Sequence, residues 1–187
     1  MKVKSIITRA LKYVGRDDLA KALDADETLT SEGAEKVETL LYCFNAVEDE
    51  LARYYFPLVF CEEFASEDGN YAIENFSHRP VKILSVKSDG KAVKFTPQPK
   101  FIRAEAQKIT VRYEYSPSAK RIDGESAFTD CVVGESLVAA GVASEYCLIE
   151  GSMQDSQLWE SRYRWEIDLA QKKYSAPHGT IPPRRWV

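Results

Sequence analysis

The hydrophobic residues of this 187-residue chain change their spacing twice, and this change constrains the fold more than any other feature. Residues 1–56 and 126–174 carry apolar side chains at the three- and four-residue spacing of amphipathic helices. Residues 57–117 instead carry short runs of aromatic and β-branched residues between turn-forming residues, as strands do. The pattern predicts an α+β fold, in which helices from both ends of the chain form a bundle around a β insertion.

Four segments follow from this pattern. We expect N-terminal bundle helices over 1–56, the β insertion over 57–117, C-terminal bundle helices over 118–175 and an extended tail over 176–187. The first segment predicts a helix that ends at Gly15, a short helix over 17–24, and a long helix capped by Thr30 or Ser31 that ends at Pro57.

The last two helices are expected over about 130–149 and 153–174. The first of them is rich in alanine, glycine and serine, and small side chains let a neighbouring helix approach closely. We therefore expect it to be the partner of the long N-terminal helix. In the second, the run Arg162-Tyr163-Arg164-Trp165 predicts a core position for Trp165 and outward arginines.

The β insertion contains a recognisable hairpin. Asp89-Gly90 readily supplies the positive φ angles of a tight turn, and Pro97 and Pro99 interrupt strand pairing. Residues 100–103, which follow the prolines, read as a cationic loop with Lys100 and Arg103 as candidate contact residues. The strands are expected over 58–60, 71–73, 81–86, 93–95 and 108–115.

Composition excludes some functions. Hydrophobic residues make up 44% of the chain, which is enough for a core, and the net charge of −4 argues against a general nucleic-acid binder. The four cysteines are far apart with no CxxC pair, so we expect no zinc site and read Cys43 and Cys147 as small apolar core residues. We also expect no signal peptide and no membrane span.

Catalytic patterns are missing from the sequence. His78 and His178 have no recognisable nucleophile nearby, and we find no phosphate loop or dinucleotide fingerprint. The acidic run 48–50 cannot share one helix face and reads as solvated, and 67–70 lacks the spacing of a calcium loop. We therefore expect no enzyme activity, cofactor or metal.

The tail has the chemistry of a docking peptide. Residues 176–187 hold three prolines and one glycine, which prevent a helix and favour an extended chain. Arg184, Arg185 and Trp186 near its end combine a cationic fork with a large aromatic anchor. We expect this tail to bind another chain, although it could instead lie back on its own domain with Trp186 in a surface groove.

Several segments together resemble the head–tail connector, or adaptor, proteins of tailed bacteriophages and prophages of Gram-positive hosts. The resemblance covers most of the chain and depends on the order of the segments, because none is specific alone. Small adaptors in other phage groups are almost wholly helical, so the long β insertion departs from them. The segments are the opening amphipathic helix, 39–45, 47–52, 55–58, 79–86, 141–148 and Arg184-Arg185-Trp186-Val187.

This resemblance implies a structural protein of the virion neck, assembled in the host cytoplasm. It implies a ring of twelve copies below the portal protein, through which DNA passes without sequence-specific binding. The tail Ile181-Pro182-Pro183-Arg184-Arg185-Trp186-Val187 would then dock on the portal or on an adjacent copy. The hairpin Asp89-Gly90-Lys91 would contact the next neck or tail protein.

Two alternatives remain open from the sequence. One is a different neck protein, of the tail-completion or stopper type, which would share the ring but have other neighbours. The other is a host peptide-binding or nucleic-acid-binding module, in which Arg162, Arg164 and the loop at Lys100 would contact the ligand.

Overall fold

The computed structural model describes residues 1–129 and 132–175, which form two compact units. The helical unit joins Met1–Phe44 to the chain from Ile122 onward, and the β unit is Asn45–Arg121. Helices at both ends with strands between them confirm the predicted α+β fold. The boundaries of the β unit fall at residues 45 and 121, whereas the sequence placed them at 57 and 117.

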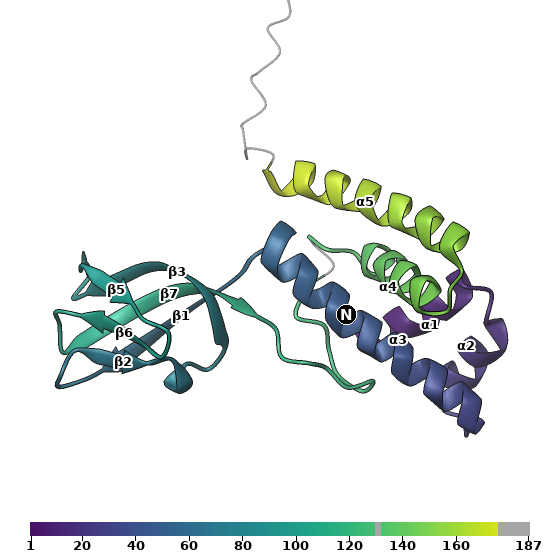
Figure 1. Ribbon diagram of the computed structural model, residues 1–187, viewed down its shortest axis with the longest axis horizontal. Helices are drawn as coiled ribbons and strands as arrows, with labels where there is room; N and C mark the ends of the chain where they lie inside the picture. The colour runs from purple at the N-terminus through teal and green to yellow at the C-terminus, as the bar shows by residue number, and fades with distance from the viewer. Residues whose placement is uncertain (130–131, 176–187) are drawn as a thin grey trace, which may run out of the picture. The chain divides into compact units, whose positions relative to one another are not determined.

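The helical unit is built around α4 (Figure 1). Its helices are α1 (Val3–Tyr13), α2 (Asp17–Asp24), the first part of α3 (Ser31–Glu50), α4 (Glu135–Ile149) and α5 (Met153–Ser175). Figure 1 shows α4 between α1 and α5, and its backbone approaches these two helices most closely. Gly134 precedes α4, so this helix begins later than the predicted residue 130.

Small side chains make the close approach to α4 possible. Ala139, Ala140, Gly141, Ala143 and Ser144 are all buried, so α4 presents little bulk to its neighbours. The expected partner was the long helix α3, but the closest partners are α5 and α1. The sequence identified the helix that forms the closest contacts but did not identify α5 and α1 as its nearest neighbours.

The predicted start of α3 is confirmed by its cap. The Thr30 hydroxyl accepts the Gly33 N–H at 3.1 Å, which satisfies one of the amides that a helix start leaves unpaired. At its other end, α3 widens into a π-helical turn over Leu51–Tyr55. The Phe56 N–H donates to the Leu51 carbonyl at 2.7 Å, and Pro57 ends the helical segment.

The acidic run at the end of α3 is not the solvated face that we expected. Glu48 is only 1% exposed. Asp49 pairs with Arg53 at 2.7 Å and accepts a hydrogen bond from the Ser116 hydroxyl. The Glu48 charge adds to the effect of burial in raising the pKa of Tyr115. These carboxylates therefore connect the last turns of α3 to the end of the sheet within the β unit.

The β unit contains two antiparallel sheets that share one core. Its strands are β1 (Leu58–Ala65), β2 (Asn70–Ala72), β3 (Arg79–Ser88), β4 (Lys91–Ala92), β5 (Phe95–Pro97), β6 (Phe101–Ala104) and β7 (Lys108–Ser116). One sheet has the order β1-β7-β3-β4 and the other β2-β6-β5. A single 3₁₀ turn, Ile73–Asn75, follows β2.

Strand β7 follows its predicted alternation. Ile109, Val111 and Tyr113 are buried in the core between the two sheets, and Arg112 faces outward. From the other sheet, Tyr71 and Ile102 complete this core. Strand β3 has two register shifts against β7, which bend it at the positions where alternation is lost.

Strand β6 was missed by sequence reasoning. The two prolines suggested a loop over 100–103, but the Gln98 N–H donates to the Phe101 carbonyl at 2.8 Å and closes a tight turn from β5 into β6. Ile102 is fully buried, so the segment is a core strand. Arg103 consequently lies on a strand, and only Lys100 lies in the connecting turn.

The interpretation of two cysteines as core residues is confirmed. Cys43 and Cys147 are buried free thiols, and burial raises the pKa of the Cys43 thiol to about 12. Cys61 is also free but exposed on β1. Cys131 lies outside the described residues.

We predict that Gly69→Ala destabilises the β unit by roughly 3 kcal/mol, whereas Gly90→Ala costs roughly 1 kcal/mol. Both glycines have positive φ angles, +72° and +76°. A Cβ at residue 69 would lie 2.5 Å from the Ala104 carbonyl oxygen, whereas one at residue 90 meets nothing within 4 Å. Urea unfolding of both variants measures the difference, and equal losses would contradict the packing argument.

Candidate interaction surface

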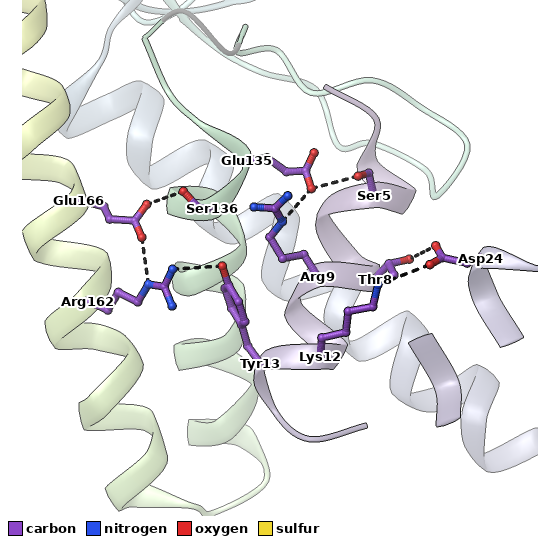
Figure 2. Close-up of polar contacts among 10 residues, drawn as sticks. All are labelled: Ser5, Thr8, Arg9, Lys12, Tyr13, Asp24, Glu135, Ser136, Arg162 and Glu166. Atoms are coloured by element: carbon purple, nitrogen blue, oxygen red, sulfur yellow. Dashed lines mark hydrogen bonds and ion pairs between the residues drawn. The ribbon is translucent and has the colours of Figure 1, made fainter. Parts of the chain in front are cut away.

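Two partly buried carboxylates, those of Glu135 and Glu166, hold α1 and α5 against α4 (Figure 2). Glu135 at the start of α4 accepts hydrogen bonds from the Ser5 hydroxyl and the Arg9 guanidinium, both at 3.0 Å. On the other side, Glu166 of α5 accepts from the Ser136 hydroxyl at 2.7 Å. These bonds set which faces of α1 and α5 stay outward.

The second set of contacts surrounds Arg162. Its Nε donates to Glu166 at 3.0 Å and its Nη2 to the Tyr13 hydroxyl at 3.2 Å, as Figure 2 shows. The hydrogen bond to Glu166 raises the pKa of Arg162. The same guanidinium lies 4.8 Å from the Tyr13 ring centre, and Tyr13 stacks on Trp159 at 4.5 Å. Arg162 therefore stabilises the contact between α1 and α5. Its guanidinium is engaged within the unit, whereas the nucleic-acid-binding alternative needs it to contact a ligand.

The predicted orientation of Trp165 is wrong. Trp165 is 60% exposed, and Tyr163 is the buried aromatic residue of this run at 1%. The helix is turned so that Ser156, Tyr163, Ile167 and Ala170 face inward. This small and aromatic face fits the Ala-rich surface of α4.

The outward side of α5 carries an apolar row that we name the outer stripe: Leu158, Trp165 and Leu169. Residues at positions i, i+7 and i+11 of an α-helix lie on one face. The three side chains are 65%, 60% and 37% exposed. α5 therefore has two apolar faces, of which one packs inside the helical unit.

A cationic groove of about 540 Å³ runs along α1. Its four cations are Lys2, Lys4, Arg9 and Lys12. Three of them are paired: Lys4 with Asp26 at 2.5 Å, Arg9 with Glu135, and Lys12 with Asp24 at 3.7 Å. Asp24 also accepts from the Thr8 hydroxyl at 2.9 Å. This compensation lowers the attraction of the groove for a polyanion.

The predicted residues of the β unit are exposed at two hollows. Asp89 (φ 48°) and Gly90 form the expected tight turn before β4, beside a hollow of about 390 Å³ that Glu63 and Lys108 also line. Lys91 begins β4 and is exposed. Lys100 lines a separate hollow of about 660 Å³, which Arg103 does not line.

The predicted residues of the tail and His178 lie outside the described residues. These tail residues are Ile181, Pro182, Pro183, Arg184, Arg185, Trp186 and Val187. Sequence reasoning did not find the outer stripe, although its seven- and four-residue spacing is visible in the sequence of α5.

Comparison of the sequence with protein-family models and curated sequences identifies no relative. The chain matches no protein-family model and no curated protein sequence. Within residues 1–129 and 132–175, no cluster of three or more histidine, cysteine or acidic side chains could hold a metal ion. No helix in the same ranges combines the length and hydropathy needed to cross a membrane.

We predict that Glu166→Gln destabilises the helical unit by about 1.5 kcal/mol, and Glu160→Gln by less than about 0.5 kcal/mol. Both carboxylates form i,i+4 pairs with arginines on α5, but the Glu166 side chain is 13% exposed and the Glu160 side chain 39%. Urea midpoints followed by far-ultraviolet circular dichroism measure both losses. A larger loss for Glu160→Gln would contradict the assigned role of Glu166.

Proposed function

We propose that this protein is a structural head–tail connector of a tailed bacteriophage, which assembles as a ring below the portal protein. The order of segments over most of the chain supports the proposal. An inserted β unit within a helical unit also agrees with a ring body from which a second unit extends.

The observation that carries the proposal is the outer stripe on α5. A helix with one buried apolar face and a second exposed one is suited to pack between two bodies. In a ring, the inner apolar face of α5 packs within its own subunit, and the outer apolar face packs against the next copy or the portal. Repetition around a closed ring supplies such a surface with a partner at every subunit.

The energy available from this stripe suits an assembly that forms on contact. A tryptophan side chain buries about 200 Å², so covering the exposed part of Trp165 contributes about 3 kcal/mol before ordering costs. That contribution is too small to hold two free subunits together firmly. When several subunits bind to a preassembled portal, each subunit has a high effective concentration next to its neighbour. The same outer stripe is then sufficient to hold adjacent subunits together.

The charge distribution supports a conduit that DNA passes without binding. The net charge is −4, and the cations Lys4, Arg9 and Lys12 of the α1 groove are paired with carboxylates. A DNA-binding surface would need uncompensated cations that release counterions from phosphates. We therefore expect weak, sequence-independent DNA contacts at low salt only.

The deciding experiment mixes the purified chain with the portal protein encoded by the same genome and measures mass in solution. We expect a ring on the portal, and no ring with a chain that lacks Ile181–Val187 but keeps its folded circular dichroism spectrum. Absence of any portal complex would overturn the connector proposal and would favour a tail-completion protein.

Trp165→Ala should weaken portal-dependent ring formation by about tenfold or more, because it removes the largest single part of the outer-stripe area. The matched control is Tyr42→Ala, which removes another aromatic side chain, 70% exposed, from α3 of the same unit. Titration of each variant against the portal measures the effect. Equal weakening by the two variants would contradict a specific role of the outer stripe.

A further inference from the structure

A further pocket lies at the turn between α4 and α5, and Tyr13 at the end of α1 also lines it. This turn pocket has a volume of about 420 Å³. Its lining includes three aromatic side chains, two carboxylates and one guanidinium: Tyr13, Tyr146, Trp159, Glu150, Asp155 and Arg16. It is therefore both aromatic and acidic.

The two carboxylates give the turn pocket its charge. Neither Glu150 nor Asp155 forms an ion pair with any residue of the described ranges. Arg16 is already engaged, because both Nε and Nη2 donate to Asp18 at 3.2 Å. A cationic ligand would thus find two carboxylates without having to displace an existing partner.

This negative charge also affects the pKa of two other side chains that line the pocket. Burial raises the pKa of Cys147 and of Tyr146, and the nearby carboxylates add to it: Asp155 and Glu150 for the thiol, Glu150 for the phenol. Aromatic rings beside carboxylates also favour a guanidinium, which can stack on a ring and donate to both oxygens of a carboxylate.

Leu158 and the ring of Trp159 form an apolar rim beside the charged part. Leu158 belongs to the outer stripe and is 65% exposed, whereas Leu148, Ile149 and Met153, which are exposed near the same turn, do not line the pocket. A ligand with a large apolar group next to its cation would bury this rim and exclude water from the ion pairs.

The chain itself carries a segment with this chemistry. We propose that the turn pocket binds residues 181–187 of a second copy of this chain, with Arg184 and Arg185 on the two carboxylates and Trp186 on the apolar rim. The inference deepens the proposed function by naming the surface that receives the tail, and it commits to an adjacent copy.

Chain length favours a second copy over the same copy. Trp159 and Ser175 lie about 24 Å apart along α5. Reversing the chain at the end of α5 takes about four residues, and the five residues 180–184 then extend at most about 17 Å. Even with its side chain, Arg184 then reaches at most the near edge of the pocket at Trp159 and falls short of Asp155, which lies about 30 Å from Ser175 along α5, whereas no such limit applies to a neighbour.

The test titrates a fluorescein-labelled peptide of residues 176–187 into the full chain and follows its anisotropy, without any portal protein. We expect saturable binding that weakens with added salt. Glu150→Gln/Asp155→Asn should weaken binding at least about tenfold, whereas Glu38→Gln/Asp168→Asn removes two exposed carboxylates elsewhere on the unit and should leave it unchanged.

Changes in the peptide keep the test independent of folding defects in the pocket variant. A peptide with Arg184→Gln and Arg185→Gln, or with Trp186→Ala, should also bind at least about tenfold more weakly to the unaltered chain. Absence of wild-type peptide binding, or equal binding by the two pairs of carboxylate variants, would overturn the inference.

Sedimentation of the full chain distinguishes the two possible sources of the tail. Self-association that rises with concentration and is lost in Trp186→Ala supports docking between copies. A chain that stays monomeric while it still binds the peptide would mean that the tail docks on its own chain, contrary to the inference. Because the portal is absent from both assays, their failure leaves the connector proposal untouched, and failure on the portal leaves this pocket untouched.

Discussion

The close approach between α4 and α5 is the contact on which the helical unit depends. It is possible because the facing side chains of α4 are small, and Ser144 within this surface donates its hydroxyl to the Ser156 carbonyl at 3.1 Å. Once α5 lies this close, the sizes of its own side chains decide its rotation. Tyr163 and Ile167 fill the inner side, and Leu158, Trp165 and Leu169 must then face outward.

The strands and helices of this chain differ in how fully their sequences specify them. β7 has one buried and one exposed face, so its alternation alone predicts both the strand and its orientation. β6 is a four-residue strand next to two prolines, and it is stabilised mainly by pairing with β2 and β5. β2 is distant in sequence, and β5 has only three residues. Local patterns contain no information about such pairing, so the segment looked like a loop.

The orientation of α5 shows a second limit. The apolar residues of α5 form two stripes, and periodicity cannot tell which of them is buried. The amphipathic pattern suggested Trp165 for the core, but the surface of α4 that receives α5 is lined with small side chains, which a sequence pattern for α5 does not reveal. For the same reason the acidic run 48–50 seemed solvated, although Glu48 is buried within the β unit.

The distribution of charge then determines what the outward faces can recognise. On α1 the cations face carboxylates of α2, α4 and the loop after α2, so their fields are largely cancelled at the surface. At the α4–α5 turn, Glu150 and Asp155 lie beside exposed apolar side chains and the aromatic rings of Tyr13 and Trp159. Burial of apolar area contributes binding energy but little selectivity. A small number of uncompensated carboxylates determines which partner is selected and how it is oriented. Recognition by this unit is therefore expected to select a cationic and aromatic partner at one end of α5, while the rest of the outer stripe contributes area.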